Sequence, residues 1–475
     1  MRAGDTLTVI PGTTRRACFV GPGSYVDDVY LATTVTHVRV SNGASVSQLV
    51  CHPKLPLVAG LAAELPAVHV WDCNGGKPRE LGATGTAAVP YGDGDGRWHL
   101  PRALAVADDR GDRGPVVAWH PEQPLLIAAT GGVEGQVVRW TPDGGFRAED
   151  RIQPVPPWQA MAFSPDGRAL WVGPSRVGGR HGSKVIDLAS GAVTGGAGWD
   201  TGIALHPGGA LAATMYSDQA ATHVLFARLE GAAAALRIQR RALILDADGY
   251  QTPVFNADGR YLAIRGNSYE NSLEVFAFPS LTRVLGLTLG PRHVRGGLTP
   301  EEDREYRAWS RHNIAFGAAP GVLWVGTPDG TLVEADLDAG RAARHDVLGG
   351  APVTALCATP AGDLVTATAD GTVALVPVLS TPAPDDRQLA LFSLPAPAPA
   401  PAVPGPPPSR ELAAAFLAAT GDVPGDGDLD ELLDVTDGSR SWAPGALSTV
   451  TTSDASDPAW LRQRAALNEM FTRGR

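Results

Sequence analysis

Short apolar stretches recur along the chain, and a turn follows each of them. The residues that open these turns, here called the anchor residues, begin dipeptides of the His-Pro or Ser-Pro type or degenerate forms of them: His52, His120, Ser164, His206, Asn256, Gly317 and Thr359. The residue two places before each anchor is small: Val50, Ala118, Ala162, Ala204, Val254, Ala315 and Cys357. A position that stays small in every unit indicates an inner strand crowded by its neighbours.

Each unit continues with two further strand-like segments. A turn such as SPDG at 164–167 leads into a leucine-bearing segment, and a third apolar segment follows, as in VHVWD at 68–72. Successive anchors lie roughly 40 to 70 residues apart, and the shorter spacings match a blade of four strands. The pattern therefore predicts an all-β chain that folds as a β-propeller of about seven four-stranded blades.

The motifs of these units resemble those of the WD-repeat family over residues 35–380. The SPDG turn, the strand after it and a third strand of the VHVWD kind carry the resemblance, which implies a propeller fold. The chain departs from the family because Trp71-Asp72 is its single Trp-Asp pair. It also lacks the Gly-His dipeptide with which the family ties the polar network of each blade. The resemblance is therefore to a degenerate WD-repeat propeller.

The seventh unit ends at its third strand near Leu379, which leaves its blade without an outer strand. The segment TTVTHVRV at 33–40 precedes the first unit and alternates as a strand does. Pairing this segment with the last unit would close the ring and remove an exposed edge, and we expect this closure. The alternative is that residues 1–45 form a leader that pairs with nothing.

Composition divides the chain into four parts. These are an N-terminal leader (1–32), the propeller closed by an N-terminal strand (33–380), a Pro/Ala-rich linker (381–408) and an acidic, partly helical tail (409–475). The linker favours a stiff, extended polyproline-type conformation. In the tail, we expect Ser409 to cap a helix that ends at Gly421 and residues 426–437 to form a solvated acidic stretch.

Two insertions interrupt the repeat. Residues 82–114 predict a polar loop that is longer than ordinary connections between blades. In the second insertion, Thr299 and Glu302 have the spacing of a capping box, with Pro300 at the first helical position. A short helix is therefore expected over about residues 300–310.

The net charge and the cysteines indicate which partners and which cellular compartment to expect. The formal net charge of −11 removes the attraction on which nucleic-acid binding depends and weakens any attraction to anionic lipid. Neither an apolar signal core nor a stretch of ~20 apolar residues is present, so we expect a cytoplasmic location. Cysteines without C-x-x-C spacing are interpreted as free thiols in a reducing compartment: Cys18, Cys51, Cys73 and Cys357. Arginine far outnumbers lysine, as in GC-rich bacterial genomes.

The sequence contains no recognised catalytic or metal-binding motif. It has no G-x-S-x-G nucleophile elbow, and GGRHGSK at 178–184 lacks the residue order of a phosphate-binding loop. Asp426, Asp428 and Asp430 begin like a calcium loop, but Glu431 stands where such a loop needs glycine. Histidines at anchor positions are interpreted as turn residues that contact the backbone. We therefore predict no catalytic residue, no metal ligand and no cofactor.

A ring of aromatic and polar residues precedes the inner strands of the middle blades. In a propeller, these positions surround one mouth of the central channel, so they are candidates for a partner-binding surface: Trp158, Gln159, Trp199, Asp200, Tyr250, Gln251, Trp309, Arg311 and His312. The alternative interpretation is that the aromatic side chains wedge between adjacent blades and serve only packing.

The last helix, expected over residues 458–473, has more apolar side chains than a freely solvated helix would carry: Trp460, Leu461, Leu467, Met470 and Phe471. The entropy cost of ordering this segment nearly cancels the gain from burying them, which disfavours a contact with a separate molecule. We therefore expect the helix to dock on the other tail helix or on a blade of the same chain. A partner of the propeller could displace it.

The leading functional hypothesis is a monomeric scaffold or adaptor that binds other proteins, but neither nucleic acid nor membrane. The main alternative is a propeller enzyme of the hydrolase or lactonase type with its site at the central channel. Such an enzyme needs metal ligands or acid-base pairs that converge there, and inner strands rich in Ala, Val, Ile and Leu supply few of them. A third possibility is a regulatory module in a bacterial signalling or conflict pathway.

Overall fold

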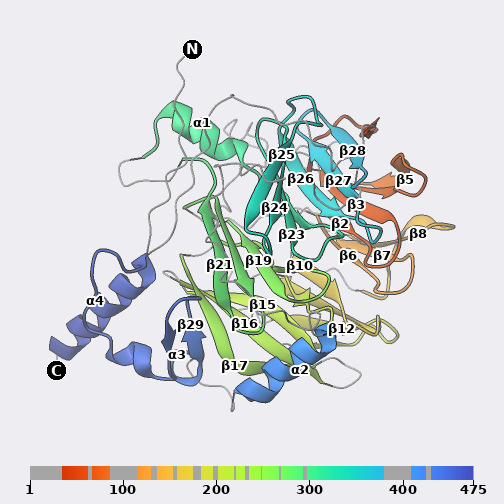
Figure 1. The fold of residues 1–475 in the computed structure, drawn as a ribbon. Helices are drawn as coiled ribbons and strands as arrows, with labels where there is room; N and C mark the ends of the chain where they lie inside the picture. The colour runs from red at the N-terminus through yellow and green to blue at the C-terminus, as the bar shows by residue number, and fades with distance from the viewer. Residues whose placement is uncertain are drawn as a thin grey trace, which may run out of the picture.

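A computed structural model describes most of the chain. The described residues are 35–62, 67–85, 115–129, 136–152, 158–174, 183–195, 202–218, 221–230, 235–247, 249–266, 269–291, 297–378, 408–423 and 429–473. They form seven antiparallel sheets arranged as the blades of a β-propeller (Figure 1). The fold predicted from the repeat is therefore confirmed.

Each blade contains four strands in chain order from the inner to the outer strand, except that the outer strand of blade 7 is the N-terminal strand β1. Blade 1 consists of β2 (Val46–Cys51), β3 (Leu57–Ala62), β4 (Val68–Asp72) and β5 (Arg79–Thr84). Blade 2 consists of β6 (Val116–Trp119), β7 (Leu126–Ala129), β8 (Val137–Thr141) and β9 (Gly145–Ala148). Blade 3 consists of β10 (Trp158–Phe163), β11 (Ala169–Pro174), β12 (Lys184–Asp187) and β13 (Val193–Gly195).

Blades 4 to 7 follow the same plan. Blade 4 consists of β14 (Ala204–Leu205), β15 (Leu211–Asp218), β16 (Ala221–Glu230) and β17 (Ala235–Asp246), and blade 5 of β18 (Val254–Phe255), β19 (Tyr261–Arg265), β20 (Ser272–Ala277) and β21 (Thr282–Thr288). Blade 6 consists of β22 (Ile314–Phe316), β23 (Val322–Gly326), β24 (Leu332–Asp336) and β25 (Arg341–His345). Blade 7 consists of β26 (Val353–Ala358), β27 (Leu364–Thr368), β28 (Thr372–Val376) and β1 (Thr36–Arg39).

The hydrophobic core lies between neighbouring blades. One cluster joins Ala59 and Val70 of blade 1 to Trp119 and Trp140 of blade 2, and similar clusters fill the joints between later blades. Because strand residues alternate between the two faces of a sheet, a blade contributes to a different core on each face. The strands therefore need apolar residues at nearly every position.

The anchor residues follow the inner strands, and the side chains of five of them accept hydrogen bonds from amides of their own turns: His52, His120, Ser164, His206 and Asn256. In His52, His120 and His206, Nδ1 accepts hydrogen bonds from amides of the following turn. The second ring nitrogen reaches the next blade in two of them. The Nε2 atom of His52 lies 2.9 Å from the carbonyl oxygen of Gln123, and that of His206 lies 3.1 Å from the carbonyl oxygen of Gly259. The predicted contact with the backbone is thus present, and it extends across the joint between blades.

The ring closes as expected. Strand β1 pairs antiparallel with β28, in a register that places Thr36 opposite Leu375 and Arg39 opposite Thr372. Val40, directly after β1, is buried in the core between blades 1 and 7. The N-terminal strand therefore covers the edge of the last blade.

Helix α1 (Pro300–Ala308) begins where the sequence predicted it. The Thr299 side chain accepts a hydrogen bond from the Glu302 amide, and the Glu302 carboxylate accepts one from the Thr299 amide. The expected polar loop over residues 82–114 begins later than predicted. Residues 82–84 belong to β5, which completes blade 1 as its outer strand. Residues 86–114 lie outside the described part of the chain.

The tail returns to the propeller. It contains α2 (Ser409–Thr420), α3 (Leu429–Leu432), β29 (Asp434–Thr436), β30 (Ser441–Trp442), η2 (Ala446–Thr449) and α4 (Ala459–Arg473). Ser409 does not cap α2, because Pro408 occupies the N-cap position and Ser409 is already helical. Gly421 ends α2 with a φ of 69°. Asp437 is buried, so the expected solvated acidic stretch is wrong at this end.

Candidate functional site

The aromatic side chains expected at the channel mouth are buried between blades. Trp158 packs in the core between blades 2 and 3, Tyr250 in the core between blades 4 and 5, and Trp309 in the core between blades 5 and 6. Their exposed fractions are 5%, 3% and 6%. These rings therefore act as packing residues, as the alternative interpretation held, and offer little surface to a partner.

Arg311 and His312 belong to a basic cluster with Arg265. Arg311 Nη1 donates to the carbonyl oxygen of Gly249 at 3.0 Å, and the Arg265 guanidinium donates to three neutral oxygen atoms, each at 2.9 Å. Burial and the neighbouring Arg311 lower the pKa of Arg265 to about 9. Burial and both arginines lower the pKa of His312 to about 4. These hydrogen bonds tie the loops of blades 5 and 6 together.

The other residues of the expected ring do not complete an open surface in the described structure. Gln159 is part of β10. Gln251 is half-buried, and its backbone N–H donates to the carbonyl oxygen of Arg265 at 3.0 Å. Trp199 and Asp200 lie outside the described residues. Within the ring, the side chains that stabilise joints between blades are thus those of Trp158, Tyr250, Trp309 and Arg311.

The tail forms the second candidate site, and its first helix packs on blades 4 and 5. The Phe416 ring lies 4.9 Å from the Phe226 ring and 5.0 Å from the Phe278 ring, between centroids. At the other end of α2, the carbonyl oxygen of Ser409 approaches the turn of blade 4 so closely that a Cβ atom on Gly208 would lie 2.3 Å from it. Figure 1 shows α2 against the lower ends of β16 and β17.

After α2, the chain follows the outer strand of blade 4. Asp422 accepts a hydrogen bond from Gln239 at 2.8 Å and forms an ion pair with Arg228. Strand β29 then pairs in parallel with β17, with Val435 opposite Ala242, and β30 pairs with β29. The tail therefore adds two strands to blade 4 and covers its outer edge.

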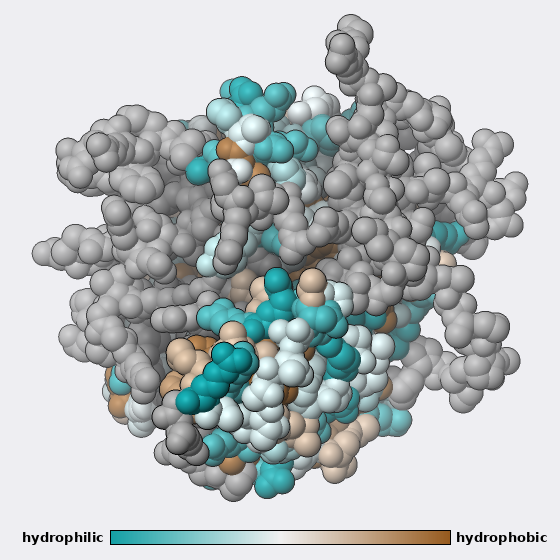
Figure 2. Space-filling view, turned by 90° about the vertical axis from the view of Figure 1, so that its left-hand side faces the viewer, coloured by the Kyte–Doolittle hydropathy of each residue, from teal (hydrophilic) through white to brown (hydrophobic). Residues whose placement is uncertain are grey.

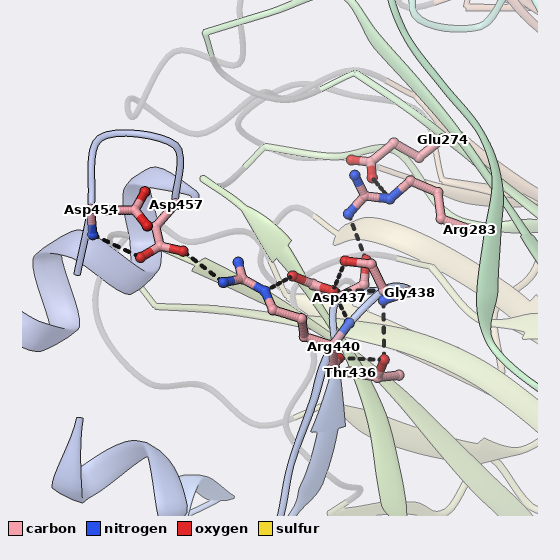
Figure 3. Close-up of polar contacts among 9 residues, drawn as sticks. Glu274, Arg283, Thr436, Asp437, Gly438, Arg440, Asp454 and Asp457 are labelled. Atoms are coloured by element: carbon pink, nitrogen blue, oxygen red, sulfur yellow. Dashed lines mark hydrogen bonds and ion pairs between the residues drawn. The ribbon is translucent and has the colours of Figure 1, made fainter. Parts of the chain in front are cut away.

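A chain of polar contacts links this addition to blade 5 (Figure 3). Arg283 pairs with the half-buried Glu274 at 3.3 Å and donates to the carbonyl oxygen of Asp437 at 2.5 Å. Burial would raise the pKa of Asp437, but hydrogen bonds from Arg440 and Ser439 together lower it. Asp437 therefore stays ionised inside the turn between β29 and β30.

These polar contacts continue to the start of α4. Arg440 donates to the Asp457 carboxylate at 2.6 Å, and Asp457 accepts a second hydrogen bond from the Asp454 amide at 2.9 Å. The Asp246 carboxylate, at the end of β17, accepts from the first helical amides, those of Ala459 and Trp460, at 3.3 and 3.0 Å. A residue of blade 4 thus acts as the N-terminal cap of α4.

Only the first half of α4 is covered. Trp460 and Leu461 are buried in a core with Ile244 of blade 4 and Val435 of β29. Leu467, Met470 and Phe471, here called the apolar tip, are 41%, 58% and 66% exposed. The expectation that all five apolar side chains of this helix are covered is therefore wrong for three of them, because the helix projects away from the blades toward its C-terminal end (Figure 1).

Figure 2 turns this side of the molecule toward the viewer. Its lower half shows small hydrophobic areas between hydrophilic ones, on the surface that blade 4 and the tail share. This side of the molecule is thus a mixed surface, as at the rim and centre of many protein interfaces.

Sequence reasoning missed three residues that position the tail: Asp246, Phe416 and Arg440. The apolar spacing of Leu412, Ala413 and Phe416 in α2 was a usable signal for a docked helix face. Asp246 had no such signal, because it caps a helix more than 200 positions away in the chain.

No family model matches the sequence, and no curated protein matches it. Among the described residues, no group of three or more His, Cys, Asp and Glu side chains is arranged to hold a metal ion. In the same part of the chain, no helix is both long and apolar enough to cross a membrane.

Proposed function

We propose that this protein is a scaffold that binds other proteins, and that the apolar tip of α4 is its contact site. The observation that carries the proposal is the exposure of Leu467, Met470 and Phe471 on a helix whose first half is firmly docked. Their spacing of three and four residues places them on one face of the helix. Exposed apolar side chains grouped in this way are typical of interaction sites.

The docking of the first half of α4 favours binding, because it orders the helix before a partner arrives. Asp246 caps the first turn, and the Asn468 side chain donates to the carbonyl oxygens of Leu447 and Val450, both at 2.8 Å. A partner then pays little of the entropy of ordering a helix. The partner that fits is a protein with an apolar groove, which takes up side chains at these spacings from one helix face.

The rest of the proposal follows the sequence. The repeat motifs support placement among degenerate WD-repeat propellers. The cysteines, which have no C-x-x-C spacing, support a reducing compartment such as the cytoplasm. In this proposal, the propeller serves as a rigid frame that presents the tail.

The test is an affinity measurement on the full-length protein. Proteins retained from a lysate of the source cells are identified, and the Kd of each purified candidate is measured with the wild type, Phe471→Ala and Tyr269→Ala. Tyr269 is 53% exposed and lies between β19 and β20 of blade 5, outside the tail, so it is the matched control. We expect Phe471→Ala to raise Kd by roughly tenfold or more and Tyr269→Ala to leave it unchanged. The proposal is wrong if the affinities of all partners are insensitive to Phe471→Ala while its melting temperature equals that of the wild type.

A further inference from the structure

Two cysteines meet at the joint between the first and the last blade. Cys51 ends β2 of blade 1, Cys357 lies in β26 of blade 7, and their Sγ atoms are 3.5 Å apart. The two residues are 306 positions apart in the chain. They therefore face each other across the seam where the two ends of the propeller come together.

The surroundings of the pair are apolar and ordered. Both side chains belong to the core between blades 1 and 7, with Leu49, Ala355 and Val365 among its members. Contact with Cys51 and burial hold the pKa of the Cys357 thiol well above its ordinary value. Cys357 is therefore the less reactive thiol of the pair at neutral pH, and half-buried Cys51 is the more accessible sulfur.

Packing alone does not explain why two sulfurs are placed here. Cys357 occupies the small position two places before the anchor Thr359, which alanine or valine fills in the other blades. A disulfide needs the two sulfurs to approach to about 2.05 Å with Cβ atoms about 3.8 Å apart, and small rotations of side chains already in contact can provide this.

We propose that Cys51 and Cys357 form a reversible disulfide that fastens blade 1 to blade 7. The oxidant is a low-molecular-weight disulfide. The Cys51 thiolate attacks one of its sulfur atoms, which forms a mixed disulfide and releases one thiol. Cys357 then loses its proton to solvent and attacks the Cys51 sulfur, which releases the second thiol. The protein loses two hydrogen atoms in total, and the small disulfide is reduced to two thiols.

The bond would add a covalent closure to a ring that is otherwise closed without one. In the reduced protein, the seam is held by the pairing of β1 with β28, by the shared core and by a hydrogen bond of 2.6 Å from the Thr354 hydroxyl to the Val46 carbonyl oxygen. A cross-link that joins distant chain positions restricts the unfolded chain strongly. Oxidation therefore stabilises the closed propeller.

The experiment treats full-length protein with oxidised glutathione or with dithiothreitol, alkylates the free thiols and maps the peptides by mass spectrometry. We expect a linked peptide pair containing Cys51 and Cys357 in the oxidised sample and a melting temperature higher by roughly 3–7 °C, both reversed by dithiothreitol. Cys357→Ser should abolish the linked pair and leave Cys51 as a stable mixed disulfide with glutathione. Cys51→Ser is the second variant if Cys357→Ser does not fold.

Cys73→Ser is the matched control, because Cys73 is buried in the same core and should leave the linked pair intact. The proposal is overturned if oxidised wild type carries Cys51 only as a glutathione adduct or links it to a different cysteine. A linked pair without a rise in melting temperature would overturn the stabilising role.

Discussion

Three anchor side chains, those of His52, His206 and Asn256, bond to two blades at once. In His206, Nδ1 accepts from the Gly208 amide of its own turn, and Nε2 donates to the Gly259 carbonyl oxygen of the next blade. Both bonds require the neutral ring with its proton on Nε2. Burial lowers the pKa of His52, His120 and His206 accordingly. An anchor side chain of this kind therefore needs one acceptor for its own turn and one donor for the next blade. In blade 5, the side-chain amide of Asn256 provides both: its oxygen accepts from the Tyr261 amide, and its nitrogen donates to the Pro320 carbonyl oxygen.

We expect the free energy of unfolding to fall when the pH is lowered from 7.5 to 5.5. The folded state holds the pKa of the three anchor histidines below the ordinary value of 6.5, so the unfolded chain binds protons first. The contribution of these histidines to the free energy of unfolding is complete above pH 6.5 and is lost as the pH falls below that value. His312, with a pKa of about 4, acts in the same direction. Urea unfolding midpoints across this pH range measure the effect.

The control for this prediction replaces His52, His120 and His206 together with asparagine. Asparagine keeps a donor and an acceptor, as Asn256 shows, but has no proton to gain. The midpoint of the triple variant should change less with pH, with His312 responsible for part of the remaining slope. An equal slope in both proteins would show that the anchor histidines do not carry the pH dependence.

Turn glycines next to the anchors offer a sharper comparison. Gly209 and Gly259 both end an anchor turn with positive φ, of 69° and 74°. A Cβ atom on Gly209 would meet nothing within 4 Å, whereas one on Gly259 would lie 2.4 Å from His206 Nε2. Gly209→Ala should therefore cost about 1–2 kcal/mol for its backbone conformation alone. Gly259→Ala should cost about 1–3 kcal/mol more because it also displaces the ring.

Denaturant unfolding of the two variants measures this difference. Equal losses of stability would mean that the contact between His206 and the next blade contributes nothing to the joint.

At the scale of elements, the sequence predicted those whose pattern is local. The capping box of Thr299 and Glu302 fixed the start of α1, and the alternation at 33–40 located β1. Strand β29 could not be predicted because it is three residues long and pairs with a strand of blade 4. The extent of docking along α4 also depends on where the edge of blade 4 ends, which its own residues do not encode.

The cap of α4 provides a test of how the tail is held. Asp246→Ala removes the acceptor for the amides of Ala459 and Trp460, and a lost cap costs about 0.5–2 kcal/mol. Amides of α4 should then exchange with deuterium about 2- to 30-fold faster, while those of α2 keep their rates. Asp246→Asn is the matched control, because asparagine caps helices nearly as well as aspartate. Unchanged exchange in Asp246→Ala would mean that the buried Trp460 and Leu461 alone fix the helix.

At the scale of the whole molecule, the repeat determines most of the architecture. Seven small positions before seven anchors were enough to predict seven blades, because the crowding of inner strands is a property of the closed ring. The prediction of an aromatic partner-binding surface was wrong for a related reason. Positions at or just before the start of the inner strands lie beside a joint, where Trp158, Tyr250 and Trp309 fill space that small inner residues leave. A sequence cannot distinguish a ring that faces the channel from one that faces the neighbouring blade.

Closure of the ring leads to the last prediction. Deleting residues 1–41 removes β1, exposes the edge of β28 and takes Val40 out of the core, which costs about 1.5–3 kcal/mol for that side chain alone. An exposed strand edge pairs readily with other chains, so the truncated protein should melt at a lower temperature and elute as aggregates in size-exclusion chromatography. Deleting only residues 1–34 retains the whole of β1 and should leave both properties unchanged. If the longer deletion remained monomeric with an unchanged melting temperature, β1 would be dispensable, and the joint between blades 1 and 7 would be held by its core and the hydrogen bond from Thr354 to Val46.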